Sequence, residues 1–250
     1  MTLLVIALFF GGLAAGLVDS IAGGGGLVTL PVLLALGLPE QLAIATNKGQ
    51  AVFGATSSAV SFWRQGGIDT KRAPLAFVAG ALGSLAGAAL LLWMAPGPLK
   101  PLVVVLLVAA AVFVALPKRV RTSATPIPWP RLAVVAIAGS IGAYDGFFGP
   151  GTGTLLIVAF AGVFGDSLTR ASGNAKVVNL ASNLAAFTLF AIRGKIVWSF
   201  AVPMAVGNVC GAFIGSRLAM KGGDRVVRVA VLLVVTAIVA KLVWGLLQRA

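Results

Sequence analysis

The stretch GLVDSIAGGGG at residues 16–26 decides the fold, because its pattern occurs a second time as GAYDGFFGPGTG at residues 142–153. Each copy carries an aspartate a few residues before a run of glycines, and Asp19 precedes Asp145 by 126 residues. Both copies lie in otherwise apolar sequence, so the glycines interrupt hydrophobic segments at matching places. Duplicated halves with such interruptions are typical of secondary transporters.

The correspondence continues through the rest of each half. The later matches are ATNK at 45–48 with SGNAK at 172–176, and FWRQG at 62–66 with FAIRG at 190–194. Lys48 precedes Lys176 by 128 residues, nearly the offset that relates the two aspartates. The chain is therefore expected to consist of two homologous repeats.

Composition places the chain in a membrane. Of its 250 residues, 59% are hydrophobic and only 10% are charged, whereas soluble domains carry about 25% charged residues. The net charge of +13 comes mostly from short loops between apolar runs, where basic residues set topology, so no nucleic-acid partner is expected. Histidine is absent and Cys210 is the lone cysteine, so no metal site, cofactor or internal disulfide is expected either.

Ten apolar segments are expected to be helices, five on each side of a basic, proline-rich linker. Their approximate limits are 3–19, 26–37, 42–62, 73–95, 99–116, 132–145, 153–165, 169–192, 197–218 and 226–247. The predicted domains are a first transmembrane repeat at 1–117, a cytoplasmic linker at 118–131 and a second transmembrane repeat at 132–250.

The first two segments of each half are shorter than the ~20 residues that a membrane-crossing helix needs. Each pair is joined by the glycine run, so we predict a glycine-broken hairpin or re-entrant element in each half. The predicted fold class is an all-α membrane protein of two homologous, inverted repeats of about five hydrophobic segments.

Basic residues favour the inverted arrangement over a parallel one. If each short pair enters and leaves on one side, the basic residues divide unevenly between the two sides. The cytoplasmic side then holds Arg64, Lys71, Arg72, Lys118, Arg119, Arg121, Arg131, Arg170, Arg217, Lys221, Arg225 and Arg228, and the outside holds Lys100, Arg193, Lys195 and Arg249. If each pair is instead one broken crossing, Arg170 and the basic residues at 217–228 move outside. The first arrangement has the stronger cytoplasmic excess of basic residues.

Lys48 and Lys176 are predicted to lie near the middle of the membrane. Each stands nine residues beyond a helix-start signal, Pro39 or Ser167, which is roughly 13 Å along a helix in a hydrocarbon core of ~30 Å. A charge at that depth needs a partner or a wet cavity. Either the lysines are structural partners of Asp19 and Asp145, or they supply positive charge to an anion site, and a substrate that displaces one partner would reconcile the two.

The glycine breaks favour the anion site. A helix that starts after Gly26 or Gly153 points its free N–H groups and the positive end of its dipole at the break, and such an end binds anions. Polar residues on the following helices form a candidate cavity wall. The predicted substrate-binding residues are Gly24, Gly25, Gly26, Asn47, Lys48, Gln50, Gly151, Thr152, Gly153, Asn174, Lys176, Asn179 and Asn183, with Asp19 and Asp145 as coupling or ion-pair residues.

These blocks resemble the TauE/SafE family of sulfite and organosulfonate exporters, over nearly the whole chain. The residues that carry the resemblance are Gly16 to Gly26, the 45–48 block, Gly142 to Gly153, and Arg170 to Asn183. At 172–174, Ser-Gly-Asn stands where a threonine-glycine-threonine type of turn is more usual. The resemblance implies a multi-pass carrier in the bacterial inner membrane that exports sulfite, sulfoacetate or a related organosulfonate.

The expected partners are the small anion and the lipid bilayer, with a homodimer as a further assembly to test. The coupling ion, if there is one, is a proton or sodium at the aspartates. The rival function is a cation or metal permease that uses the two intramembrane aspartates, although clustered acids and histidines are lacking. A membrane-embedded enzyme is not expected, because no paired base and nucleophile is visible.

Overall fold

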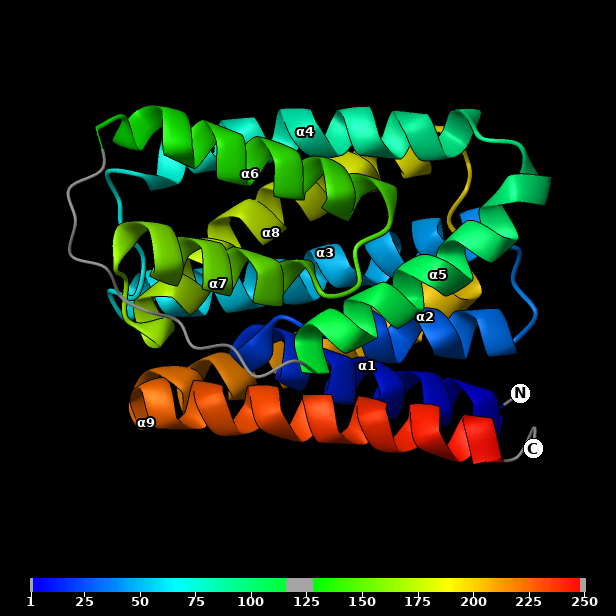
Figure 1. Cartoon of the computed structure of the whole chain (residues 1–250). Helices are drawn as coiled ribbons and strands as arrows, with labels where there is room; N and C mark the ends of the chain where they lie inside the picture. Colours follow the sequence, from blue (N-terminus) through cyan, green and yellow to red (C-terminus); the bar gives the residue numbers. More distant parts are fainter. Residues whose placement is uncertain (1, 116–127, 248–250) are drawn as a thin grey trace.

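The chain folds into a bundle of α-helices. The computed structural model describes the backbone of residues 2–115 and 128–247 and the side chains of residues 2–113 and 128–222. Within these ranges the helices are α1 (Thr2–Ala22), α2 (Gly26–Ala35), α3 (Glu40–Arg64), α4 (Ala73–Trp93), α5 (Pro96–Ala115), α6 (Pro130–Phe147), α7 (Thr152–Phe164), α8 (Leu168–Ile192) and α9 (Trp198–Leu247). Figure 1 shows that they run roughly along one axis.

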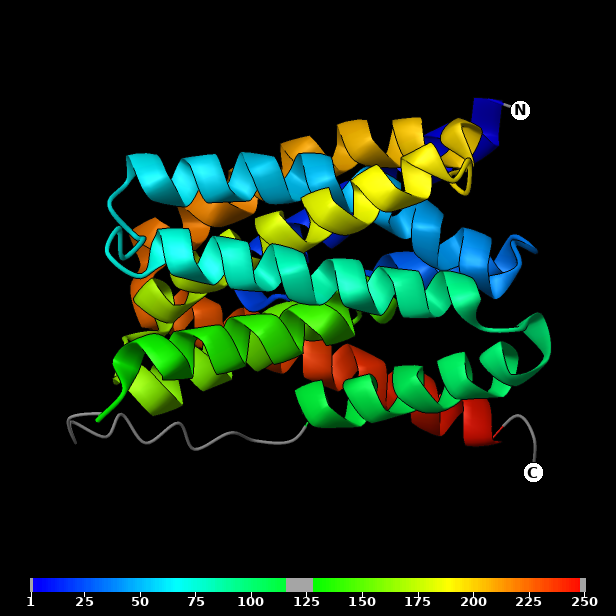
Figure 2. The ribbon, with the colours of Figure 1, turned by 90° about the horizontal axis from the view of Figure 1, so that it is seen from above.

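The last helix spans two of the expected segments, 197–218 and 226–247. A straight helix with the 50 residues of α9 would be ~75 Å long, far more than the ~30 Å hydrocarbon core. Figure 2 shows that α9 instead turns back, so that its first and second arms run in opposite directions. The prediction of ten separate helices was therefore wrong at one point: the ninth and tenth segments are two arms of one helix, because no break in helical structure separates them.

Two further expectations need correction. The first segment is not short, since α1 has 21 residues and is long enough to cross a membrane. The linker is shorter than predicted at its end, because Pro130 and Arg131 already belong to α6, where proline suits a first helical position. The linker residues before 128 lie outside the described part of the chain.

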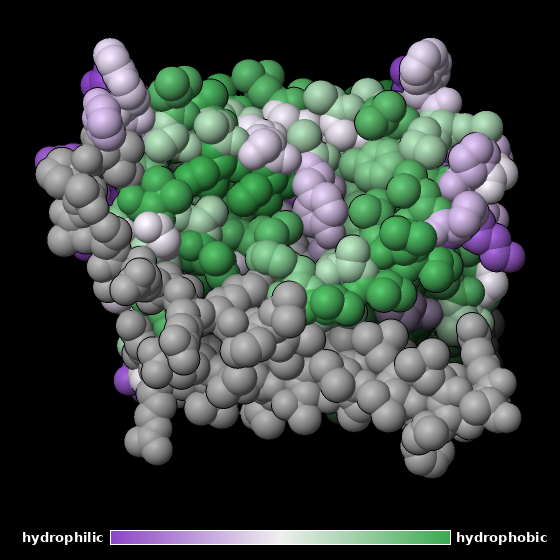
Figure 3. All heavy atoms as spheres, viewed as in Figure 1, coloured by the Kyte–Doolittle hydropathy of each residue, from purple (hydrophilic) through white to green (hydrophobic). Residues whose placement is uncertain are grey.

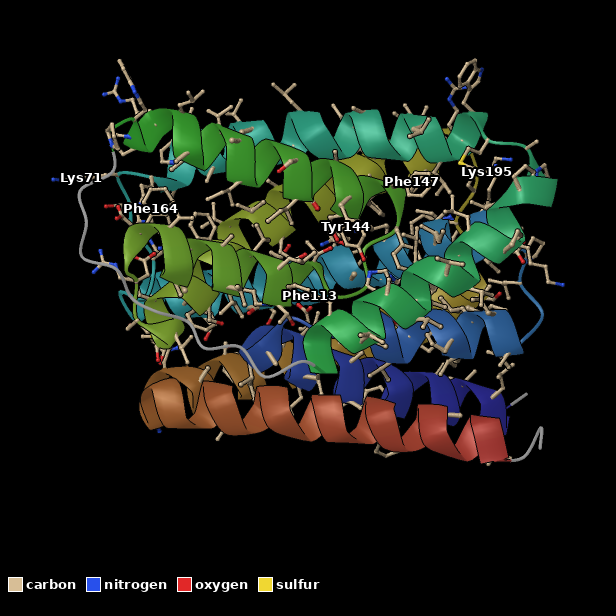
Figure 4. The ribbon with its side chains drawn as sticks, in the orientation of Figure 1. Lys71, Phe113, Tyr144, Phe147, Phe164 and Lys195 are labelled. Carbon is tan, nitrogen blue, oxygen red and sulfur yellow. The ribbon has the colours of Figure 1, made fainter. Side chains whose placement is uncertain are left out.

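The helices alternate between two ends of the bundle, marked by Lys71 and Lys195 (Figure 4). We call these the Lys71 end and the Lys195 end. The chain starts at the Lys195 end, reverses inside the bundle between α1 and α2, and returns to that end (Figure 1). Helices α6 and α7 make the opposite excursion, from the Lys71 end inward and back. Both reversals occur at the glycine runs.

Glycines allow two pairs of helices to pack backbone to backbone. In α4, a side chain on Gly83 or Gly87 would overlap the backbone of α6 at Gly139 and Ala143. In α9, Gly211 packs in the same way on Leu13 of α1. The small residues at these positions are therefore close-packing contacts, as such residues usually are in membrane bundles.

Five helical segments are long and apolar enough to span a membrane by length and composition. They are Thr2–Ala22, Ala73–Trp93, Pro96–Phe113, Leu168–Ile192 and Trp198–Gly222. Large apolar side chains are exposed on the outer faces, among them Phe10 and Leu82. Figure 3 shows hydrophobic residues over the visible middle of the bundle and hydrophilic ones gathered at its two ends. This distribution suits a bundle surrounded by lipid.

Candidate anion site between the helix breaks

The two helix breaks meet at the centre of the bundle. Gly23 and Gly151 have positive φ of 78° and 83°, a conformation that glycine adopts without strain. Gly23 and Gly153 are packed so closely that a side chain on either would overlap the backbone of the other. The hydroxyl of Thr154 donates to the carbonyl of Ala22 at 2.7 Å. The two breaks therefore pack against each other and stabilise each other's conformation, and Gly153 is part of this packing contact.

An ion pair beside the second break joins the two halves of the chain. Lys48 Nζ lies 2.8 Å from Asp145 Oδ1, and the two side chains are only 2% and 3% exposed. Asp145 Oδ2 also accepts hydrogen bonds from the Ser182 hydroxyl and, at 3.5 Å, from the Asn183 amide. Both charges are thus neutralised and hydrogen-bonded, as charges buried at this depth must be.

The equivalent pair beside the first break is more open. Lys176 Nζ lies 2.9 Å from Asp19 Oδ2, but the Asp19 side chain is 24% exposed whereas Lys176 is fully buried. Lys176 also donates to the Asp19 carbonyl, and Asn179 donates to Asp19 Oδ2 at 3.2 Å. The other carboxylate oxygen accepts from the backbone N–H of Gly25 at 3.4 Å. The Asp19 carboxylate therefore lies where a helix N-terminus would hold an anion.

Side-chain amides from three helices surround these pairs. Asn47 Oδ1 accepts from the Thr29 hydroxyl at 2.5 Å and from the Gln50 amide at 3.0 Å. Gln50 Oε1 in turn accepts a hydrogen bond from Asn208 of α9. On α8, Asn183 donates to Asn179 Oδ1 at 2.6 Å. These bonds fix the orientation of the amides around a common space.

That space is a small polar cavity of about 30 Å³, with room for about two water molecules. It is lined by Asp19, Gly25, Gly26, Asn47, Lys48, Gln50, Ala51, Asp145, Gly149, Asn179, Asn183 and Asn208. An anion with one sulfur and three oxygens needs more room, so binding requires the cavity to widen. Lys48 has one described carboxylate partner, which leaves ammonium N–H groups to donate to a ligand.

The structure gathers most of the predicted site residues but leaves some outside the cavity. Gly24 and Gly151 belong to the breaks without lining it, and Lys176 lies behind Asp19. Thr152 was expected to offer its hydroxyl, yet that hydroxyl donates to the Gly149 carbonyl at 2.7 Å. The second break therefore satisfies much of its own hydrogen bonding.

Asn174 lies in a different network, at the Lys71 end. Its Oδ1 accepts from the backbone N–H of Asp69 and its amide donates to Asp166 Oδ2, both at 2.8 Å. Arg72 bridges the carboxylates of Asp69 and Asp166 at 2.8 and 2.7 Å. Asn174 is only two residues from Lys176, but on a helix that short offset turns it to another face, so the prediction of a site role for Asn174 does not fit its position.

Asn208 is the site residue that reading the sequence missed. Its side chain occupies space left by Gly54 of α3, where an added Cβ would overlap Asn208 Oδ1. A signal was present, because Asn208 follows Gly80 by 128 residues, the offset that relates Lys48 to Lys176. A glycine replaced by an amide at an equivalent position in an apolar helix indicates a polar role specific to the second half.

Comparison with known proteins agrees with this architecture. The sequence model described as "Sulfite exporter TauE/SafE" matches residues 8–242. The chain is 35% identical over 243 residues to the probable membrane transporter protein YfcA of Escherichia coli K12, covering 97% of this chain and 90% of that protein. It is 34% identical to a probable membrane transporter protein of Haemophilus influenzae, covering 96% of this chain and 95% of that protein.

A more distant relative is the probable membrane transporter protein YdhB of Bacillus subtilis, 24% identical over 86% of this chain and 89% of that protein. No solved structure is significantly similar to the chain. The matches cover almost the full length, and the apolar helices suit a multi-pass protein of the bacterial inner membrane. The chain belongs to the TauE/SafE family of membrane transporters.

Proposed function

We propose that this protein is a secondary transporter that exports a small sulfur-containing anion, such as sulfite, sulfoacetate or a related organosulfonate. The observation that carries the proposal is Lys48, a buried lysine that lines a small polar cavity together with side-chain amides and the start of α2. Ammonium, amide and backbone N–H groups are all donors, and a sulfite or sulfonate offers only acceptors. The proposed role is transport, which agrees with the transporter family to which the chain belongs.

We place the anion against Lys48 and assign coupling to the Asp19–Lys176 pair. The four charges around the cavity sum to zero, so an added monoanion such as bisulfite leaves one excess negative charge in a region of low dielectric. Protonation of Asp19 would restore neutrality and release the Gly25 N–H group for the anion. Asp19 suits this role better than Asp145, because its side chain is 24% exposed and that of Asp145 is 3% exposed.

A direct test is binding by the purified protein, measured by isothermal titration calorimetry. Sulfite and sulfoacetate should bind, and sulfate tests selectivity within oxyanions. Divalent cations should not bind, because each aspartate already holds a lysine and a cation would have to displace it. Binding of a divalent cation with no binding of any sulfur oxyanion would replace this proposal with the cation permease.

We also propose that the halves, 1–117 and 132–250, are inverted repeats around the linker at 118–131. Equivalent contacts cross between the halves in both directions. Val197 N donates to the Thr46 hydroxyl at 3.0 Å, and Asp69 N donates to Asn174 at 2.8 Å; each member of one bond stands 128 residues from its counterpart in the other. The opposite excursions of the two glycine-broken helix pairs support the same symmetry (Figure 1).

Cysteine labelling separates this topology from the parallel one. In a Cys210→Ser background, Arg193→Cys should react with an impermeant thiol reagent outside intact cells, and Lys221→Cys should be protected. Both positions are exposed in the structure. The reverse result, with Lys221→Cys labelled and Arg193→Cys protected, would favour parallel repeats.

A further inference from the structure

A groove separate from the central cavity runs along the outside of the bundle between α3, α8 and the first arm of α9. Figure 2 shows these three segments side by side. The groove has a volume of about 700 Å³ and is lined largely by apolar side chains, among them Val52, Phe53, Val60, Leu184, Val209 and Phe213. Several of these are exposed, so the groove opens toward the surrounding lipid.

The polar side chains inside the groove already have hydrogen-bond partners within the protein, so they do not require a polar ligand. The Thr56 hydroxyl donates to the Val52 carbonyl at 2.7 Å, and the Ser57 hydroxyl donates to the Val209 carbonyl at 3.1 Å. Near the mouth, the Gln65 amide donates to Ser61 at 3.0 Å. Because these donors are used within the protein, the body of the groove suits a hydrocarbon chain.

Two arginines, in contrast, stand at one end of the groove. Arg64 and Arg217 both line it, and Arg217 lies over the Phe213 ring at 4.0 Å. Neither arginine forms an ion pair with any carboxylate whose side chain the structure describes. The groove therefore combines an apolar body with two guanidinium groups that lack an acidic partner in the described part of the protein.

The dimensions fit one leaflet of a bilayer. From Val52 to Arg64 the groove follows 12 residues of α3, which is ~18 Å, and half the hydrocarbon core is ~15 Å. A smaller apolar groove continues past Phe53 and Val209 toward Trp198 at the other end, and no cation lines it. The charged end is thus the Lys71 end, which is cytoplasmic in the proposed topology.

We propose that this groove binds an anionic phospholipid of the inner leaflet, with its phosphate between Arg64 and Arg217 and an acyl chain along α3 and α9. Basic pockets between membrane helices on the cytoplasmic side commonly hold anionic head groups, and guanidinium groups pair well with phosphate. The site lies outside the anion cavity, so lipid binding is independent of the proposed transport function.

The test is native mass spectrometry of the delipidated full-length protein with equimolar phosphatidylglycerol and phosphatidylethanolamine. Wild-type protein should retain phosphatidylglycerol preferentially. Arg64→Gln/Arg217→Gln should weaken that binding roughly 30-fold, from ~1 kcal/mol for each charge. Thr56→Phe fills the groove without changing charge and should reduce binding of both lipids. The matched control is Lys71→Gln/Arg131→Gln, which removes two exposed charges near the same end and should change binding less than twofold.

Three outcomes would overturn the proposal. The first is no preference for phosphatidylglycerol, and the second is an equal loss of phosphatidylglycerol binding in the control variant. The third is a groove occupied by a second copy of the chain, seen as a dimer that Thr56→Phe dissociates while lipid binding is unchanged. Melting temperatures of all variants check that they fold. Sulfite binding by the arginine variant should match the wild type, so failure of the lipid site and failure of the anion site give different results.

Discussion

The two aspartate–lysine pairs are built from equivalent residues but have different surroundings. Lys48 and Asp145 are both buried and both line the cavity, whereas Asp19 lines it alone, with Lys176 behind. The breaks differ too, since the first offers Gly25 and Gly26 to the cavity and the second binds Thr152 to its own Gly149 carbonyl. The proposed repeats therefore differ in detail, and residues from both halves line the cavity without the symmetry that the repeat pattern would give.

The largest expected effect separates the two lysines. Lys48→Gln/Asp145→Asn and Lys176→Gln/Asp19→Asn each remove one ion pair without leaving a buried unpaired charge. The first should weaken sulfite binding by ~1.5–3 kcal/mol, the value of a hydrogen bond to a charged group. The second should retain affinity within a few-fold but lose the dependence of transport on the proton gradient. Calorimetry and proteoliposome flux measure the two effects.

Equal losses of affinity in the two double variants would show that both lysines contact the anion. A loss confined to Lys176→Gln/Asp19→Asn would place the anion against Lys176 and not against Lys48.

Asp19→Asn tests whether its carboxylate competes with the substrate. The variant removes negative charge from the Gly25 N–H group and leaves the Lys176 charge unbalanced, so sulfite affinity at neutral pH should rise roughly tenfold. Asp145→Asn is the comparison, and there the main effect should be a lower melting temperature because Lys48 becomes buried and unpaired. Reduced affinity in Asp19→Asn would mean that Asp19 orients the site and does not occupy it.

Asn208→Ala tests the polar contribution that distinguishes the second half. It removes a donor to Gln50 and one lining amide, at a cost of ~1 kcal/mol or about fivefold in affinity. The control is Ser84→Ala, which deletes a buried hydroxyl that bonds to the Ser182 carbonyl at 2.7 Å. It should lower stability with unchanged affinity. Equal effects of the two variants on affinity would make Asn208 a packing residue.

Thr152→Val should change affinity little, because its hydroxyl donates to the Gly149 carbonyl and Thr152 contacts the cavity only through Asp145. The melting temperature should fall slightly, by the ~1 kcal/mol of one neutral hydrogen bond. A clear loss of sulfite affinity at constant stability would restore the second break to the substrate site.

The smallest effect concerns the carboxylate network at the Lys71 end. Burial tends to raise the pKa of Asp69, but its hydrogen bonds with Arg72 and Lys71 and the Arg72 charge outweigh this and lower the pKa. Asp69 therefore stabilises the folded state above the unfolded pKa of about 3.9, and this contribution is lost as pH falls through the lower folded value.

Asp69→Asn should accordingly lower stability at pH 7 by up to ~1 kcal/mol, since the pair is partly exposed. The difference in melting temperature from wild type should shrink as the pH falls below 4. A constant difference between pH 7 and pH 3 would show that the carboxylate charge is not responsible.

Much of this architecture follows from the sequence. The glycine runs place both helix breaks, and nine-residue spacing from Pro39 and Ser167 places both lysines inside the bundle. Ser167 does cap α8, accepting from Arg170 N at 3.3 Å. The pairing of lysines with aspartates was left open, because sequence spacing does not specify which helices meet across the halves. Asn174 was predicted to line the cavity and Asn208 was not considered, because polar residues were weighed on single helices and not by the helices that they meet.

The crossed ion pairs have a consequence for how the protein is made. Lys48 finds the carboxylate of Asp145, 97 residues later in the chain, so during synthesis the first half enters the membrane before the native partner of this lysine has been made. An isolated first half would hold that charge in hydrocarbon at a high cost. Lys48 and Asp145 are therefore paired only once both halves are assembled, and truncation after the linker should yield a less stable product that the cell's quality-control proteases degrade.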